Sequence, residues 1–254
     1  MRLNTRKNAL IALAIVAGLT TVAGSAAAQI SASDFHPSFY GSTELDTRHS
    51  DFYLLGVYVG VGGLGWSPYF NANGYALHYR VLPDVSSSDR TLSAFLPTLG
   101  LAYASRGNGV SLGVGYAFVH NEDPGAPGAE GGGTSGVTTS FGAYHNGRGP
   151  RAMRTQLLSN YNFDSHYVWA RGRASIPFGS SRIHPARIGA EVVGQGGGKN
   201  VVNSNTWQVG PTLEYAWNPR FRTTAAGGWK SVDGSRFTNR DNAAYFKLEF
   251  SYSP

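Results

Sequence analysis

The sequence predicts an all-β fold, a closed, antiparallel, up-and-down transmembrane β-barrel of about twelve strands. Apolar and polar residues alternate with period two in one segment after another. Most of these segments are about 9–12 residues long, which is the length that crosses the hydrocarbon as a tilted strand. Gly (34 of 254 residues) and aromatic residues (13%) are both frequent. After residue 28, no run of apolar residues is long enough to predict a transmembrane helix.

The first 28 residues have the pattern of a cleavable signal peptide. Three basic residues precede an apolar stretch over 9–24, and an A-x-A cleavage site ends at Ala28. A retained membrane anchor is the alternative, but the stretch is short for a span. We therefore expect an exported chain whose residues 29–254 form a single outer-membrane barrel domain. Removal of residues 1–28 lowers the formal net charge from +6 to +3, which leaves no basic stripe and predicts no nucleic-acid partner.

The content of Cys and His argues against several kinds of site. The chain has no Cys, which excludes disulfides, thiolate metal sites and Cys nucleophiles. Its seven His residues are scattered singly, without the spacing that places two metal ligands on one face of a strand. We therefore expect no metal and no cofactor.

Twelve segments are predicted as strands, and the alternation is clearest in three of them, 109–120, 205–217 and 242–252. The last one ends in the alternating aromatic pattern of outer-membrane barrels that the assembly machinery reads, although Ser253-Pro254 follows the final Tyr252. Ten strands is the alternative count, because 38–46 and 185–194 alternate weakly. The full set is 38–46, 51–62, 73–82, 94–104, 109–120, 135–145, 152–163, 165–176, 185–194, 205–217, 221–231 and 242–252.

The connections differ in length between the two ends of the predicted barrel. Those on the side of the chain termini include the short turns at 105–108, 146–150 and 218–220, whereas most connections at the other end are longer and rich in Gly, Ser, Asn and Pro. Short periplasmic turns and longer outer loops are typical of outer-membrane barrels. Two connections are expected to break this pattern, a short one at 163–165 on the outer side and a long one at 63–72 on the inner side.

The two faces of the strands favour a membrane barrel over a soluble periplasmic β-sandwich, which would also show alternation. The predicted apolar faces carry aromatics such as Trp207 and Trp217 at the ends of one strand, and Tyr75 and Tyr79 on another. Aromatics at strand ends fit interfacial girdles. Open sheet edges cannot lie in lipid, so the sheet is expected to close.

The opposite faces carry charges that would line a narrow lumen, with glycines making room for the long Arg side chains. Arg forks bind carboxylates and phosphates, and aromatic rings offer faces for stacking, so this lumen set could hold an anionic or glycan ligand. The alternative is a structural ladder of ion pairs with Glu191, Glu214 and Glu249. The candidate ligand-binding residues are Arg154, Tyr167, Trp169, Arg171, Arg173, Arg187 and Glu191.

Three further motifs resemble known functional sites. His36-Pro37-Ser38 has the His-x-Ser spacing of outer-membrane lipid A deacylases, but it precedes the first predicted strand. It leaves a lipid-modifying enzyme, of the deacylase or phospholipase type, as the alternative function, with no catalytic residue assigned. The Gly60–Gly65 stretch fits G-x-G-x-x-G without a following helix, and the Gly194–Asn200 stretch lacks the Ser/Thr of a phosphate loop, so both are interpreted as turns or loops.

Five stretches in the second half of the chain share Gly and aromatic strand patterns: Leu158–Phe163, Trp169–Arg173, Ile188–Gly196, Gln208–Pro211 and Ala226–Lys230. In these stretches the chain resembles the BcsS-type barrels that accompany bacterial cellulose synthesis. The resemblance rests on Gly and aromatic strand patterns and implies no catalytic residue. It implies a role in exopolysaccharide export, with polysaccharide as a partner beside outer-membrane lipid and the barrel-assembly machinery. We therefore expect a non-enzymatic, porin-like narrow channel or an accessory protein of the surface or of export.

Overall fold

The computed structural model describes residues 35–48, 50–81, 88–121, 135–147, 152–179, 185–196, 205–233 and 241–254. The predicted signal peptide and most of the longer outer loops lie outside these residues. Within them the chain forms twelve strands. These are β1 (Phe35–Asp46), β2 (Asp51–Val61), β3 (Gly65–Val81), β4 (Ser88–Ser105), β5 (Asn108–Asn121), β6 (Gly136–Asn146), β7 (Arg154–Asn162), β8 (Tyr167–Phe178), β9 (Ala186–Gly196), β10 (Asn205–Ala216), β11 (Phe221–Asp233) and β12 (Asp241–Tyr252).

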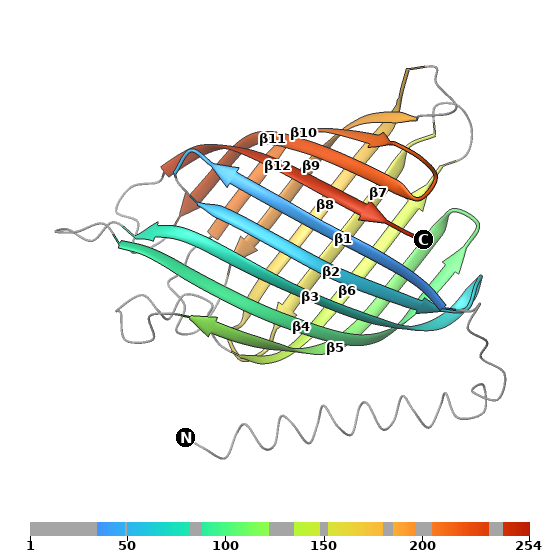
Figure 1. The fold of residues 1–254 in the computed structure, drawn as a ribbon, viewed down its shortest axis with the longest axis horizontal. Helices are drawn as coiled ribbons and strands as arrows, with labels where there is room; N and C mark the ends of the chain where they lie inside the picture. The colour runs from blue at the N-terminus through green and yellow to red at the C-terminus, as the bar shows by residue number, and fades with distance from the viewer. Residues whose placement is uncertain are drawn as a thin grey trace, which may run out of the picture.

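The strands form one closed antiparallel sheet, in which each strand pairs with its neighbours in the sequence (Figure 1). The first strand closes the barrel against the last, in a register that runs from Phe39 opposite Tyr252 to Asp46 opposite Tyr245. The predicted fold class and the count of twelve strands are thereby confirmed. The ten-strand alternative is wrong, and so is the β-sandwich, since one closed sheet replaces the two sheets of a sandwich.

The main difference from the predicted strands is at the start of β3. The strand begins at Gly65 rather than at residue 73, so the long inner connection expected over 63–72 is wrong and only residues 62–64 link β2 to β3. Trp66-Ser67-Pro68 has the composition of a turn. However, Pro68 lies in the part of β3 that pairs with β4 alone, and a strand with one unpaired side tolerates a residue without an N–H. With this short turn, the connections on the side of the chain termini are shorter than most of those at the other end, as expected.

The other prolines inside central strands also lie where a ladder is interrupted. Pro97 pairs with Ala72 of β3, but the pairing between β4 and β5 skips its position. Pro211 pairs with Ala190 of β9, and the pairs between β10 and β11 skip it in the same way. Each proline therefore costs pairing on one side only, and the barrel stays closed around it.

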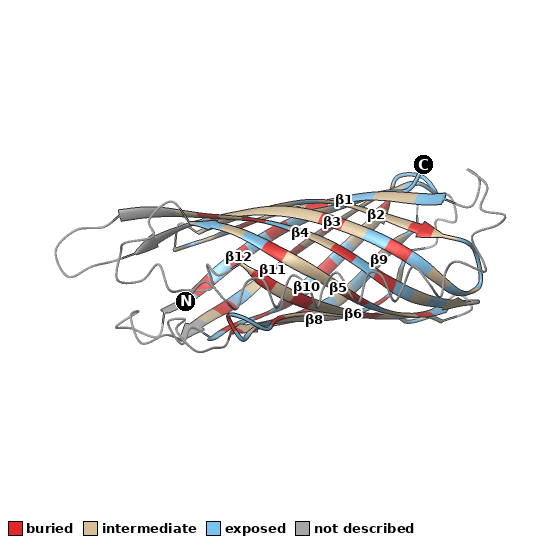
Figure 2. Cartoon of the chain, turned by 90° about the horizontal axis from the view of Figure 1, so that it is seen from below, coloured by how far each residue is buried: buried red, intermediate tan, exposed pale blue. Residues whose placement is uncertain are grey.

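The distribution of side chains is the reverse of that in a soluble protein. Large apolar side chains face outward and are exposed, such as Leu55 (65%) and Leu112 (60%). Buried positions hold polar and charged residues instead, among them Glu191, Lys230 and Lys247. Figure 2 shows buried and exposed bands alternating along single strands. An apolar outer wall around a polar lumen is the arrangement of a barrel that spans a lipid bilayer. Among the described residues, no helix is long and apolar enough to cross a membrane.

Aromatic side chains ring the outer wall near both ends. On the side of the chain termini, Trp66 lies 5.3 Å from Tyr103 and Tyr215 lies 4.8 Å from Trp217, measured between ring centroids. At the other end, Tyr161 contacts Phe163 at 5.0 Å. The strand-end positions of Trp207 (58% exposed) and Trp217 (53%) are as predicted. Together these residues form the two aromatic girdles expected at the lipid interfaces.

Tyr75 does not belong to the outer wall, although the alternation of its segment placed it there. It lies opposite Leu54 and Ala94 and faces the lumen, where its ring packs 5.7 Å from that of Phe52. An aromatic residue fits either face of a barrel strand, so the alternation alone could not decide its direction. The side chain of Tyr79 lies outside the described residues.

Glycines make room chiefly for aromatic rings rather than for the Arg side chains that we expected. Tyr40 lies directly opposite Gly56, Tyr69 opposite Gly100 and Tyr144 opposite Gly109. In each pair, a Cβ added to the glycine would collide with the ring. The rings therefore lie flat against the inner wall instead of projecting across the lumen. On the outer wall, Phe250 covers Gly41 in the same way.

Gly113 illustrates how tightly this inner wall is packed. We expect Gly113→Ala to destabilise the barrel by about 1–3 kcal/mol, because the new methyl group would meet the Tyr69 hydroxyl and lie 2.7 Å from Ser140 Oγ. The urea midpoint of unfolding from lipid vesicles measures this effect. Gly74→Ala is the matched control, because its nearest atom would be 3.6 Å away. Equal losses in the two variants would contradict the packing argument.

Candidate functional site in the barrel lumen

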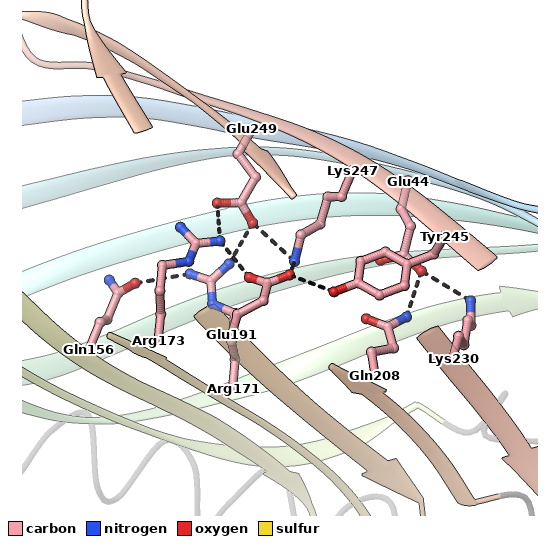
Figure 3. Close-up of polar contacts among 10 residues, drawn as sticks. All are labelled: Glu44, Gln156, Arg171, Arg173, Glu191, Gln208, Lys230, Tyr245, Lys247 and Glu249. Carbon is pink, nitrogen blue, oxygen red and sulfur yellow. Dashed lines mark hydrogen bonds and ion pairs between the residues drawn. The ribbon is translucent and has the colours of Figure 1, made fainter. Parts of the chain in front are cut away.

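The lumen contains a cluster of ion pairs that is built around Glu191 of β9 (Figure 3). The side chain of Glu191 is fully buried, and its carboxylate accepts a 2.6 Å hydrogen bond from Arg173 on the neighbouring β8. Lys247 of β12 pairs with the same carboxylate, and the Tyr245 hydroxyl donates to it at 3.5 Å. Because β12 does not adjoin β9 in the sheet, these contacts cross the lumen.

Glu249 extends this cluster along β12. Its two carboxylate oxygens accept hydrogen bonds from Arg171 at 2.6 Å and from Arg173 at 2.8 Å, both from β8. Lys247 lies 3.4 Å from the same carboxylate. Arg171 also donates to Gln156 of β7 at 3.2 Å. The cluster therefore connects β7, β8, β9 and β12 across one side of the lumen.

A second group of ion pairs lies toward the outer loops. Lys230 of β11 pairs with Glu44 at 3.0 Å and with Asp46 at 2.9 Å, both on β1. Gln208 of β10 donates to Glu44 at 2.6 Å. These contacts join β1 to β10 and β11 on the inside, next to the seam where β1 meets β12.

The two groups together form what we call the central network, which is balanced in charge. Its cations are Arg171, Arg173, Lys230 and Lys247, and its carboxylates are Glu44, Asp46, Glu191 and Glu249. No side chain in it is more than 15% exposed. Moving charges out of water is costly, and each of these is compensated by a partner. The arrangement is what a structural network requires.

The opposite wall of the lumen fills the remaining space toward the outer loops. The inward residues of β2 to β4 include Phe52, Leu54 and the buried Leu92. Tyr75 of β3 and Tyr167 of β8 come from opposite walls and lie within electrostatic range of each other. Tyr167 is held by a 2.9 Å hydrogen bond to Gln195. A charged wall and an apolar wall thus face each other across the lumen.

A separate group, which we call the mouth cluster, lies where the lumen opens on the side of the chain termini. It consists of Arg154, Arg187, Arg222 and Glu214, which come from β7, β9, β11 and β10. Arg154 pairs with Glu214 at 2.6 Å, and Arg222 lies 3.9 Å from the same carboxylate. Arg187 lies directly opposite Glu214 in the sheet and donates to the Ser175 hydroxyl at 3.1 Å and to the Ala152 carbonyl at 2.7 Å.

The structure divides the predicted lumen set between these two levels. Arg171, Arg173 and Glu191 belong to the central network, with Trp169 5.9 Å from the Arg171 guanidinium, whereas Arg154 and Arg187 belong to the mouth cluster. The ion pairs that formed the alternative interpretation are present, since Glu191, Glu214 and Glu249 all bind Arg side chains. A ligand-binding role for the predicted set stays a prediction.

Several members of the two groups were not among the predicted candidates. They share one signal in the sequence, because each lies on the inward phase of its strand. The phase of the alternation could have placed all of these residues in the lumen. It could not have shown which residues pair with each other, because pairing between distant strands depends on the stagger of the sheet. The missed residues are Glu44, Asp46, Gln208, Arg222, Lys230, Tyr245 and Lys247.

The other motifs show no catalytic geometry. His36-Pro37-Ser38 was expected to precede the first strand, but β1 begins at Phe35 and contains the motif. The Ser38 hydroxyl shares a 2.9 Å hydrogen bond with Ser253 rather than with His36. Gly62 and Gly65 have positive φ values in the turn before β3, as the turn interpretation of G-x-G-x-x-G requires. Within the described ranges, no group of three His, Asp or Glu side chains could hold a metal ion.

Comparison with known proteins adds no family. No family model matches the chain, and no curated protein matches it. Among solved structures, the chain is similar to the KdgM porin in complex with disordered oligogalacturonate (11% identity, TM-score 0.46, 85% of this chain and 99% of that one). It is also similar to the β-domain of the Bordetella autotransporter BrkA (12% identity, TM-score 0.45, 87% and 100%). A loop-deletion variant of OmpT, an outer membrane protein of Vibrio cholerae, has 10% identity, a TM-score of 0.34 and coverage of 87% and 98%. Function is therefore argued from this chain's own residues.

We expect Glu249→Gln to destabilise the barrel by about 3 kcal/mol, because it leaves Arg171 and Arg173 without their shared counter-charge in a buried place. Urea unfolding from lipid vesicles measures the loss. Glu214→Gln is the matched control and should cost about 1 kcal/mol or less, because its partners Arg154 (29% exposed) and Arg222 (42%) stay hydrated. A central network without a structural role would give the two variants equal stability.

Proposed function

We propose that the protein is a non-enzymatic β-barrel of the Gram-negative outer membrane, with a lumen that is closed at rest. It serves as a narrow, gated channel or as an accessory of the surface or of export, rather than as an open diffusion pore. The observation that carries this proposal is the central network. Its eight charged side chains cross the lumen and are at most 15% exposed, so little space is left for water at that level.

Placement in the outer membrane is supported by the outer wall. Closure removes the sheet edges that lipid could not satisfy, and the exposed apolar residues lie between two aromatic girdles, as in barrels that span a bilayer. Outer-membrane lipid is then the partner of the outer wall. The alternating apolar residues of β12 up to Tyr252 support folding by the barrel-assembly machinery, as the sequence predicted.

The proposed cargo is exopolysaccharide. Arg side chains and aromatic rings line the inner wall together, which suits contact with sugars that bear polar or anionic groups. The more specific link to cellulose rests on the resemblance of the second half of the chain to BcsS-type barrels. It is part of the proposal and has no support from family models or curated relatives.

Conductance in planar bilayers tests the closed lumen. We expect the wild-type protein to show no steady conductance of the size of an open porin, because the ion pairs occupy the lumen. The double variant Arg173→Ala with Glu249→Ala removes one cation and one carboxylate of the network, so it should produce steady conducting steps. A shift on unboiled gels shows that each protein is folded.

The matched control is Arg154→Ala with Glu214→Ala, which removes a pair of the same kind and the same net charge at the mouth of the lumen. It should stay as silent as the wild type. Steady porin-sized steps from the wild-type protein, or equal opening in both double variants, would overturn the proposal of a lumen closed by the central network.

The alternative function, a lipid-modifying enzyme, has its own test. We expect unchanged lipid A and phospholipid profiles, by mass spectrometry, in cells that express the protein, because Ser38 is bonded to Ser253 and not to His36. A deacylated lipid that appears with the wild-type protein and disappears with Ser38→Ala would establish the enzyme instead. Ser251→Ala, which removes another hydroxyl from the same end of the barrel, is the control.

A further inference from the structure

The mouth cluster is the one place in the described lumen where charge is not balanced within its own group. It holds three arginines and one carboxylate, whereas the central network holds four of each sign. We propose that the mouth cluster is a binding site for a carboxylate-bearing oligosaccharide that reaches the lumen from the side of the chain termini. This inference rests on the proposed function, because it needs a lumen that is accessible from that end.

Glu214 is the centre of the cluster. It lies 2.6 Å from Arg154, 3.9 Å from Arg222 and directly opposite Arg187 in the sheet. Arg187 is within electrostatic range of both other arginines, which repel it. One carboxylate therefore serves three guanidinium groups. A second negative charge placed among them would be attracted by the excess positive charge.

The arginines have donors to spare. Among the described residues, the only ion pair that Arg222 makes is the long one with Glu214, and its side chain is 42% exposed. Arg154 uses Nε on Asn146 and one terminal nitrogen on Glu214, so its other terminal nitrogen is not engaged by a described residue. Arg187 is already engaged, because it donates a hydrogen bond to the Ala152 carbonyl in the connection before β7. Arg154 and Arg222 are the two residues placed to bind a ligand.

The neighbouring side chains favour a saccharide over a small inorganic anion. Tyr144 of β6 faces the lumen and is 41% exposed. It lies opposite Gln156 of β7, and the next inward-facing pair of these two strands is Asn146 with Arg154. Its ring lies over Gly109 of the neighbouring β5, so one aromatic face is turned toward the lumen, with β6 between it and the strand that carries Arg154. On the other side, Ser251 offers a hydroxyl opposite Arg222. Arg forks for carboxylates, an aromatic face and hydroxyl or amide partners together suit a sugar acid.

The site can be tested with two ligands that differ only in their carboxylates. Cellotetraose and its C6-oxidised form, the β-1,4-linked tetraglucuronate, have the same backbone. We expect calorimetric titration of the folded barrel in detergent to show binding of tetraglucuronate and none of cellotetraose.

Arg222→Gln should weaken the binding about tenfold, because it removes one charge-assisted hydrogen bond. Glu214→Gln should strengthen it, because it removes the competing carboxylate. Asp51→Asn, which removes a carboxylate opposite the exposed Leu45 at the other end of the barrel, should leave it unchanged.

Each other outcome would overturn the site. Equal binding of both tetrasaccharides would show that the carboxylates are not recognised, and equal effects of Glu214→Gln and Asp51→Asn would place binding elsewhere. Inorganic phosphate that displaces tetraglucuronate at equal concentration would show a general anion site rather than a saccharide site. The conductance experiment is independent of these titrations. A silent wild-type bilayer together with absent tetraglucuronate binding would reject the site and leave the closed lumen standing.

Discussion

The constraint on which the rest of this structure depends is that no backbone amide can be left unpaired in lipid. The pairing of β1 with β12 meets it by removing the last two edges of the sheet. The same constraint explains where prolines are found. Pro97 and Pro211 keep full pairing on one side, and glycines line the gap on the other, where a Cβ at Gly115 or Gly210 would collide with the facing backbone. Close approach of the two backbones thus accompanies each lost pair.

Closure leaves the protein without an ordinary core. Most large apolar residues are needed on the outer wall, and only part of the inner wall is apolar, so the lumen depends mainly on other contacts. These contacts are of two kinds: aromatic rings that lie flat on glycines, such as Tyr69 on Gly100, and ion pairs such as those of Glu191. Buried ion pairs give little net stability compared with apolar packing, but removal of one member is costly. The central network therefore specifies which strands face each other across the lumen.

Much of this fold could be predicted from the sequence, because period-two alternation reports the two faces of a strand directly. The strand count, the outward Trp207 and Trp217 and the short turns on one side are all visible in that pattern. The prediction from this alternation was wrong where a residue type fits two environments. Trp66-Ser67-Pro68 suits a turn or a strand with one free side, and Tyr75 suits the lipid or the lumen. The division of the Arg side chains into two levels depends on strand stagger, which no local pattern encodes.

The contrast between the two levels separates structural charges from charges that are free for binding. A charge that serves the fold in a buried place must have a counter-charge, as Arg173 has Glu191 and Glu249. A charge that is kept without one must either stay hydrated or meet a ligand. Arg222 is hydrated and only weakly paired, at the point where the lumen is open. Because the charges of this residue type are balanced by carboxylates in the middle of the barrel and exceed them at its mouth, the difference reflects position, and the mouth is where an anionic ligand would lower the free energy most.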